Sequence, residues 1–263
     1  MNNTAYILQK KNYHESGSVI TLLTKEYGKI NALLRGSRNK SSTNLELFNQ
    51  FSVVLQENIA SKKTYLNSPA QPTYETLFFI QEIIPQKTCQ LEKDSLWLAF
   101  YMNELLCLLM PKNMPDLALF DAYQGTLAVL KETNSLIPEA ELALRIFEMR
   151  LLDFIGILPD FSQDQLGNCI DNAPPNACYY LSTDQGIVSH TDCLINYEMG
   201  IQSDYIPLSA SLLTALSRLD QLIYPENIKY LKGLKKITRF LIHHLLQGRP
   251  LKSREMLKQL KAK

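Results

Sequence analysis

The chain has 263 residues, of which 46% are hydrophobic and 20% are charged, a composition typical of a globular protein long enough for two domains. No apolar run approaches the roughly 18 residues that cross a bilayer, and residues 1–16 lack the basic segment and apolar run of a signal peptide. Five cysteines in a chain without an export signal indicate reduced thiols in a cytoplasmic protein and not a disulfide framework.

The net charge of +1 conceals an uneven distribution along the sequence. Residues 1–80 carry a net charge of +4, residues 81–200 carry −11, and residues 201–263 carry +8. Cations at both ends indicate a shared polyanionic partner, which the acidic middle would repel. The alternative is a mixed surface without functional meaning.

The first 75 residues predict β-structure. Five short runs rich in Val, Ile, Leu, Thr and Tyr are separated by turn signals, at residues 5–11, 18–25, 28–36, 51–57 and 64–69. Five strands over this length favour a small closed barrel. The five-stranded OB-fold is the first expectation, and an SH3-like barrel is the alternative.

The hydrophobic period changes near residue 77. Helices are predicted over residues 77–84, 95–110, 116–132 and 139–156. Asp116 suits an N-cap, and Gly156 suits the C-terminal end of the last of these helices. Helices this apolar have to pack on one another, so we expect a helical domain.

Residues 157–207 interrupt the helical pattern with Pro and Gly. Within them, residues 178–190 predict a β-hairpin whose turn holds Asp184 to Gly186. Two further helices are expected at about 208–220 and 226–247, and Ser253 suits the cap of a last short helix.

The predicted fold class is therefore α+β. An OB-fold DNA-binding domain at residues 1–78 precedes a helical domain at residues 79–263, in which residues 157–207 form a small irregular insertion containing the hairpin.

Motifs of common enzyme classes are absent from the sequence. It holds no GxxxxGK[ST], no GxGxxG after a strand, no GxSxG and no HExxH. Acidic residues are plentiful in the middle segment, but none form a recognisable acid–base pair. We therefore predict a protein that is not an enzyme.

Cys169, Cys178, His190 and Cys193 have the chemistry of zinc ligands. His190 and Cys193 have the two-residue gap of half a zinc knuckle, whereas Asn172 stands three residues after Cys169 where a second Cys is needed. The alternative is a hairpin with incidental thiols, and no metal or other cofactor is assigned.

Three stretches together resemble the RecO family of DNA repair and recombination mediator proteins. Residues 142–161, LALRIFEMRLLDFIGILPDF, resemble a central helical motif, and residues 248–260, GRPLKSREMLKQL, resemble a C-terminal motif. Residues 5–42 resemble the N-terminal motif, whose places are held by Glu15, Ser16, Leu22, Thr24, Gly28, Arg35, Gly36 and Arg38.

The resemblance implies an OB-fold, a helical domain and a zinc-finger-like insertion. It implies a cytoplasmic, nucleoid-associated mediator of the RecF pathway that binds single- and double-stranded DNA, anneals complementary strands and acts with RecR. It also implies binding to the acidic C-terminal tail of single-strand-binding protein and help in loading recombinase onto coated strands. Many members carry two CxxC pairs in the insertion, and this sequence departs from that pattern.

A protein that holds DNA by its phosphates needs exposed cations. Residues 33–42, LLRGSRNKSS, place three cations and no acid on one predicted loop. The predicted DNA-binding residues are Lys10, Lys11, Arg35, Arg38 and Lys40 in the barrel, Lys232, Lys235, Lys236 and Arg239 on one helical face, and Lys252 and Arg254 in the C-terminal motif. The alternative for each is a solvated surface.

Barrel aromatics offer a second kind of contact, because bases stack on aromatic rings. Most such residues are core, and the candidates are Tyr6, Tyr13, Tyr27, Phe48, Phe51 and Tyr65.

Arg145 lies on an apolar helix in the acidic middle and is the candidate for binding the tail of single-strand-binding protein. The alternative is an ion pair within the helix, to Glu141 or Glu148. The alternative function for the whole chain is an OB-fold interaction protein that binds RNA or a protein partner.

Overall fold

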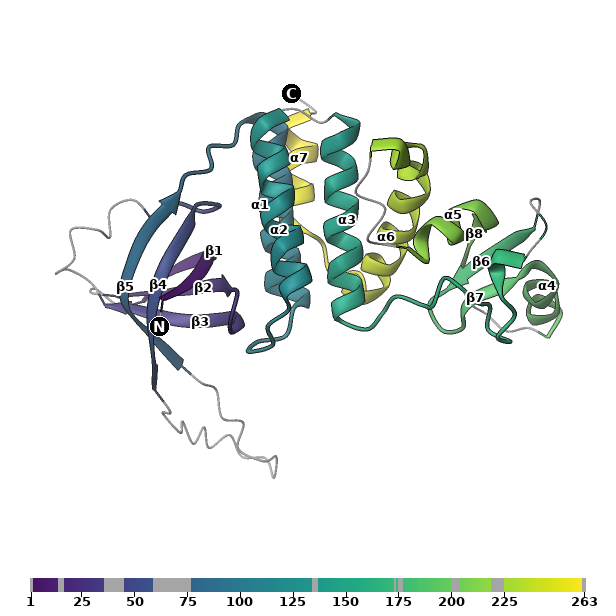
Figure 1. The fold of residues 1–263 in the computed structure, drawn as a ribbon, viewed down its shortest axis with the longest axis horizontal. Coiled ribbons are helices and arrows are strands. Elements are labelled where there is room, and N and C mark those ends of the chain that lie inside the picture. Colours follow the sequence, from purple (N-terminus) through teal and green to yellow (C-terminus); the bar gives the residue numbers. More distant parts are fainter. Residues whose placement is uncertain are drawn as a thin grey trace. The chain divides into compact units, whose positions relative to one another are not determined.

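The computed structural model describes residues 2–13, 17–35, 45–58, 77–133, 137–172, 174, 177–199, 204–218 and 225–261. The chain divides into two compact units, Met1–Lys131 and Glu132–Lys263, called unit 1 and unit 2 below (Figure 1). No helix in the described ranges is long and apolar enough to cross a membrane.

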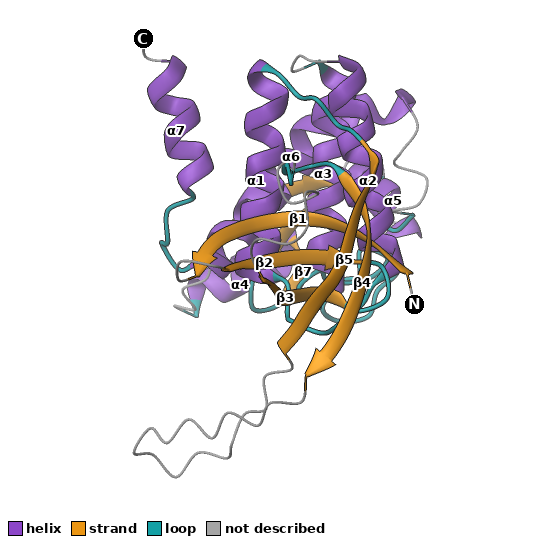
Figure 2. Cartoon of the chain, turned by 90° about the vertical axis from the view of Figure 1, so that its left-hand side faces the viewer, coloured by secondary structure: helices purple, strands orange, loops and turns teal. Residues whose placement is uncertain are grey.

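Unit 1 begins with a closed five-stranded barrel. Its strands are β1 (Asn2–Tyr13), β2 (Gly17–Thr24), β3 (Gly28–Arg35), β4 (Gln50–Asn58) and β5 (Leu77–Lys87). Around the barrel their order is β1-β2-β3-β5-β4, and β3 pairs with β5 in parallel while the other pairs are antiparallel. β4 and β5 cross over the first three strands in Figure 2. This arrangement confirms the OB-fold prediction.

The barrel closes because alternate residues of its strands are apolar. In β2 and β3, Ile20, Leu22, Ile30 and Ala32 are buried in the barrel core. Their neighbours along each strand point to the outer surface, since successive side chains of a strand face opposite ways. Phe51 and other residues of β4 and β5 complete the core: Val53, Phe78, Ile80 and Ile83.

The helix predicted over residues 77–84 is wrong, because Leu77–Lys87 forms β5. Phe78, Ile80 and Ile83 face the core, and the spacing from 80 to 83 is produced by a register shift opposite Val54 and Leu55. A bulge that inserts one residue turns a period of two into a step of three, which imitates a helix. The barrel thus extends past residue 78 to Lys87. The strand expected at residues 64–69 lies outside the described residues.

Two helices of unit 1, α1 (Lys93–Leu109) and α2 (Leu117–Thr133), accompany the barrel. Asp116 caps α2 as predicted, since the Leu119 N–H donates to Asp116 Oδ1 at 2.6 Å. Asn103 of α1 donates from Nδ2 to the Leu8 carbonyl of β1 at 3.0 Å and accepts from Tyr123 Oη at 2.6 Å. One buried amide therefore joins β1, α1 and α2.

The turn between β2 and β3 is also attached to α1. Gly28 has φ +67°, and a Cβ built there would lie 2.1 Å from the Met114 carbonyl oxygen. Beside it, the buried Lys29 Nζ donates to the carbonyls of Leu106 and Cys107, both at 2.9 Å. These carbonyls belong to the last turn of α1, where a cation is favourable. Burial lowers the pKa of Lys29 below its ordinary value.

Unit 2 contains α3 (Pro138–Phe154), α5 (Ala210–Leu216), α6 (Leu231–Leu246) and α7 (Lys252–Lys261). Gly156 ends α3 as predicted, with φ +73°, and the Ile157 N–H returns to the Leu152 carbonyl at 3.0 Å. α3 packs against α6. α7 begins at Lys252, so Ser253 lies inside its first turn and not at its cap.

Between α3 and α5 lies a small β-subdomain with β6 (Cys178–Ser182), β7 (Gly186–Ser189), α4 (His190–Glu198) and β8 (Tyr205–Ser209). The predicted hairpin is confirmed, because β6 pairs with β7 and Gly186 has φ +73° at the turn. β8 pairs with the other edge of β6. The short 3₁₀ segments Ile170–Asn172 and Pro225–Tyr230 complete the unit.

Candidate nucleic-acid interface

The outer surface of β1, β2 and β3 carries a row of paired positions that continues onto β5. Lys11 pairs with Val19, Val19 with Leu33, and Leu33 with Phe79. Lys11 is exposed, whereas Val19, Leu33 and Phe79 are half-buried. This row places apolar side chains beside a cation on one face, and we call it the barrel row.

A second row lies next to the barrel row toward the end of β3. Tyr13 pairs with Gly17, and Gly17 pairs with Arg35. Gly17 has no side chain, so the backbone of β2 is open between the Tyr13 and Arg35 positions, whose own side chains lie outside the described part of the chain. On the other side of the barrel row, Thr21 Oγ1 donates to Asn31 Oδ1 at 3.0 Å.

These rows have the chemistry that single strands require. Apolar side chains accept the flat faces of bases, and flanking cations neutralise phosphates without reading sequence. The sequence prediction identified the cations Lys11 and Arg35 but missed Val19, Leu33 and Phe79. The signal for Val19 and Leu33 was present, because they occupy the outward phase of two strands whose inward phase is apolar.

Of the other predicted barrel cations, the structure describes Lys10, which does not join this row. Lys10 is exposed, but it pairs with Ile20, a core position, so it leaves β1 on the side opposite Lys11. Arg38 and Lys40, the remaining cations of the loop at residues 33–42, lie outside the described residues.

The barrel aromatics are mostly structural. Phe48 and Phe51 are buried, and Tyr6 is buried with its ring against Tyr123 at a centroid distance of 5.2 Å. Tyr6 Oη accepts from Gln50 Nε2 at 3.2 Å, and burial raises the pKa of Tyr6 to about 12. Tyr27 packs against Phe78 of the core. Tyr65 lies outside the described residues.

A second group of cations lies on α6 in unit 2. Lys232, Lys236 and Arg239 are exposed. Leu234, Ile237 and Leu241 are buried on the opposite side of the helix. We call the three cations the α6 face.

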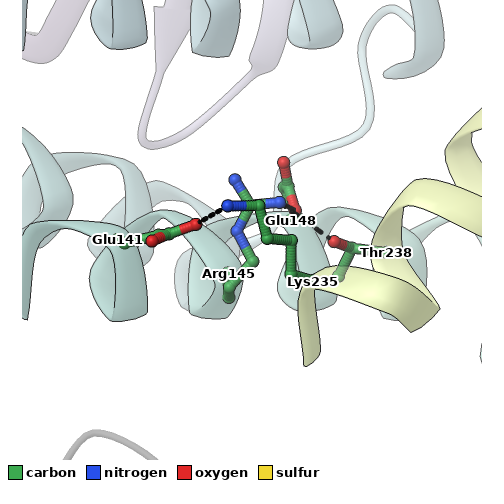
Figure 3. Close-up of polar contacts among 5 residues, drawn as sticks. All are labelled: Glu141, Arg145, Glu148, Lys235 and Thr238. Carbon is green, nitrogen blue, oxygen red and sulfur yellow. Dashed lines mark hydrogen bonds and ion pairs between the residues drawn. The ribbon is translucent and has the colours of Figure 1, made fainter. Parts of the chain in front are cut away.

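Lys235 differs from the other α6 cations. Its Nζ forms an ion pair with Glu141 Oε1 of α3, and the Lys235 side chain is 35% exposed (Figure 3). The sequence placed Lys235 on the same face as Lys232, Lys236 and Arg239, whereas the structure turns it toward α3.

Arg145 lies beside this pair and is only 5% exposed. Its Nη1 forms an ion pair with Glu148 Oε2 at 2.7 Å and donates to Thr238 Oγ1 of α6 at 3.2 Å (Figure 3). The alternative expectation, an ion pair within the helix, is therefore present. Because the guanidinium is buried and engaged, it is not available to a partner, and its structural role is to join α3 to α6.

The C-terminal motif combines buried and exposed residues. Leu251 and Ser253 are buried, Arg254 is half-buried and Lys252 is exposed. The alternation indicates that part of this motif supports the fold, while Lys252 faces solvent.

The N-terminal motif also contains residues that support the fold. Thr24 Oγ1 donates to the Gly28 carbonyl at 3.0 Å and accepts from the Tyr27 N–H at 3.1 Å. Thr24 and Gly28 therefore shape the turn between β2 and β3.

The four residues with zinc-ligand chemistry do not gather. Within the described ranges, no group of three or more His, Cys, Asp or Glu residues is arranged to hold a metal ion. His190 instead stacks on Tyr180 with ring centroids 5.8 Å apart, and Ser189, not a metal, orders the start of α4 by accepting from the Asp192 N–H.

Comparison with known proteins finds matches over nearly the whole chain. Residues 1–67 match the family described as "Recombination protein O N terminal", and residues 93–255 match "Recombination protein O C terminal". The chain is 27% identical to a protein of Alteromonas mediterranea over 97% of both chains, and 29% identical to one of Cellvibrio japonicus over 96% of this chain and 94% of that protein. A protein of Polaromonas is 28% identical over 98% of this chain and 96% of its own length. Each of the three is named DNA repair protein RecO.

Proposed function

Since this chain belongs to the RecO family and so has a role in DNA repair and recombination, we propose that it binds single- and double-stranded DNA and anneals complementary strands. The observation that carries the proposal is the barrel row, which sets Lys11 beside Val19, Leu33 and Phe79 on the outer barrel surface. A single strand on this surface would be held by phosphate contacts and by base packing, with little dependence on sequence.

Annealing requires two strands to meet without their base edges being occupied. The α6 face offers a second set of phosphate contacts through Lys232, Lys236 and Arg239, all exposed. Cations on two separate units allow one chain to neutralise two strands at once, which reduces their mutual repulsion. Lys252 is a further exposed cation of unit 2.

The proposal extends to the partners of the RecF pathway. We expect the protein to act with RecR and to bind the acidic tail of single-strand-binding protein, which would bring it to coated strands where recombinase is loaded. The exposed α6 face is better suited to an acidic tail than the buried Arg145. We also propose that the protein is not an enzyme and acts in the cytoplasm on nucleoid DNA.

The test is annealing of complementary oligonucleotides over a salt series, with Lys11→Ala plus Arg35→Ala compared with the wild-type chain. The variant should bind single strands more weakly for every sequence. The plot of log K against log salt concentration has a negative slope, and its magnitude should fall by about 0.7 for each phosphate that the variant no longer neutralises.

The matched control is Lys25→Ala, which removes an exposed cation from the β2–β3 turn at the far end of these strands. Its salt slope should equal that of the wild type. Equal slopes for the double variant and the wild type would remove the barrel row from the interface. An RNA strand of the same sequence serves as competitor, and a clear preference for RNA would favour the alternative function.

A tail-peptide experiment addresses the α6 face. A triple variant should have a lower affinity for both DNA and the acidic tail peptide; it combines Lys232→Ala, Lys236→Ala and Arg239→Ala. In the wild type, each ligand should displace the other. Peptide binding that persists at wild-type strength would place the tail elsewhere.

A further inference from the structure

The β-subdomain of unit 2 has an unusual charge. Between residues 157 and 217 the sequence contains no Lys and no Arg. The acidic residues of this stretch are Asp160, Asp164, Asp171, Asp184, Asp192, Glu198 and Asp204. A one-signed surface in a DNA-binding protein does not serve DNA, because its field repels phosphates.

One helix of the β-subdomain, α4, carries Asp192 and Glu198 and also exposes large apolar side chains. In α4, Leu194 is 52% exposed, Ile195 46% and Tyr197 82%, and Met199 at its end is 63% exposed. Scattered apolar residues on a surface are ordinary, but four within six positions of one short helix form a contiguous patch. We call this patch the α4 face.

The α4 face is not the side by which the helix attaches. The buried Asn196 holds α4 to the subdomain, with its Nδ2 donating to Gln185 Oε1 at 2.9 Å and to Tyr205 Oη at 3.4 Å. Ser189 caps the helix through the Asp192 N–H. These polar contacts do not use Leu194, Ile195 or Tyr197, whose side chains are exposed to another molecule.

From this we infer that the α4 face is a docking surface for a protein that presents apolar side chains framed by Lys and Arg. Asp192 and Glu198 of α4, within a stretch that has no Lys or Arg, favour a cationic partner, since opposite fields steer association and like charges oppose it. The apolar side chains supply the desolvated centre that binding energy requires.

The same charge argues against four other occupants. DNA and anionic lipid would be repelled, and so would the acidic tail proposed for the α6 face. A second copy docked face to face would place two sets of acids against each other. The inference goes beyond the proposed function and does not depend on it.

The test uses the full-length chain and a fluorescent amphipathic peptide built from Leu and Lys. Two peptides serve as probes for comparison: one with Glu in place of Lys, and one with the Leu/Lys residues scrambled. The Leu/Lys peptide should bind at least tenfold more tightly than either, as measured by fluorescence anisotropy.

The double variant Leu194→Ser plus Tyr197→Ser should have at least tenfold lower affinity for the Leu/Lys peptide, while its affinity for DNA stays within twofold of wild type. The matched control is Leu117→Ser plus Met256→Ser, which removes exposed apolar side chains elsewhere and should leave the affinity within twofold. Glu198→Gln should weaken the peptide and lower the salt dependence of its binding without touching the apolar residues.

The inference is overturned if the Leu/Lys peptide binds the double variant as it binds the wild type, or if the scrambled peptide binds equally well. It is also overturned if sedimentation shows a wild-type dimer that the double variant loses, because a second copy would then occupy the face. DNA binding that falls in the double variant would instead assign the face to nucleic acid.

Discussion

Arg145 and Glu148 form a buried ion pair in α3, with Nη1 2.7 Å from Oε2 and side chains 7% and 0% exposed. Both residues occupy places of the central helical motif, where sequence alone allowed either a partner-binding or a structural role. The buried pair and its contact with Thr238 give these two residues of the motif a structural role. The pair holds α3 and α6 together.

Arg145→Ala should lower the free energy of unfolding by about 3–5 kcal/mol, because it leaves Glu148 charged and buried without its partner. Urea denaturation measures the change. Arg150→Ala is the matched control in the same helix: its pair with Asp153 is 3.9 Å long and more exposed, so the expected loss is below about 1 kcal/mol. Similar losses for both variants would contradict the structural role of Arg145.

Gly28→Ala should lower the free energy of unfolding by at least about 2 kcal/mol. The left-handed φ alone costs an Ala residue roughly 1–2 kcal/mol, and the added Cβ meets the Met114 carbonyl at 2.1 Å. Gly125→Ala, in the middle of α2 with nothing within 4 Å of the added carbon, should instead stabilise by about 0.5–1 kcal/mol. Thermal melts that shift in the same direction for both would refute this account of the turn.

The wild-type chain should lose stability between pH 10 and pH 12. Tyr6 keeps its proton in the folded state up to a pKa of about 12, whereas the unfolded chain releases it near 10. The protonated Tyr6 therefore makes its full contribution to the free energy of unfolding below pH 10. This contribution, on the order of 2–3 kcal/mol, is lost as the pH rises to 12. The stability difference between wild type and Tyr6→Phe should narrow by this amount, and a difference independent of pH would refute it.

Lys236→Ala should reduce the magnitude of the slope of log K against log salt concentration for single-strand binding by about 0.7. Lys235→Ala should change this slope little. The reason is that Lys235 Nζ is engaged by Glu141, while Lys236 is exposed on the α6 face. The two residues are adjacent in sequence, so each is the control for the other. Equal effects on the slope would show that Lys235 leaves Glu141 to bind DNA.

Sequence periodicity predicted four barrel strands, the hairpin and the positions of most helices, because those elements have one apolar face each. It failed for β5, where Phe79 and Ile84 lie off the core face and a register shift breaks the alternation. It also could not separate Lys235 from Lys236, since the difference depends on Glu141, 94 residues away. Charge patterning identified which segments hold exposed cations, but which cation meets a carboxylate is decided only by packing.

The amide of Asn103 and the ammonium of Lys29 have a consequence for how the protein can be divided. A fragment that ended after β5 would keep every barrel strand. It would lose Asn103, which donates to the Leu8 carbonyl, and the Leu106 and Cys107 carbonyls that accept from Lys29. It would also uncover Tyr6 where Phe120 and Tyr123 pack on its ring. We therefore expect that the barrel does not fold on its own. The shortest soluble piece that retains the five barrel strands should end after α2, near residue 133, and a library of truncations should show one sharp gain in yield there.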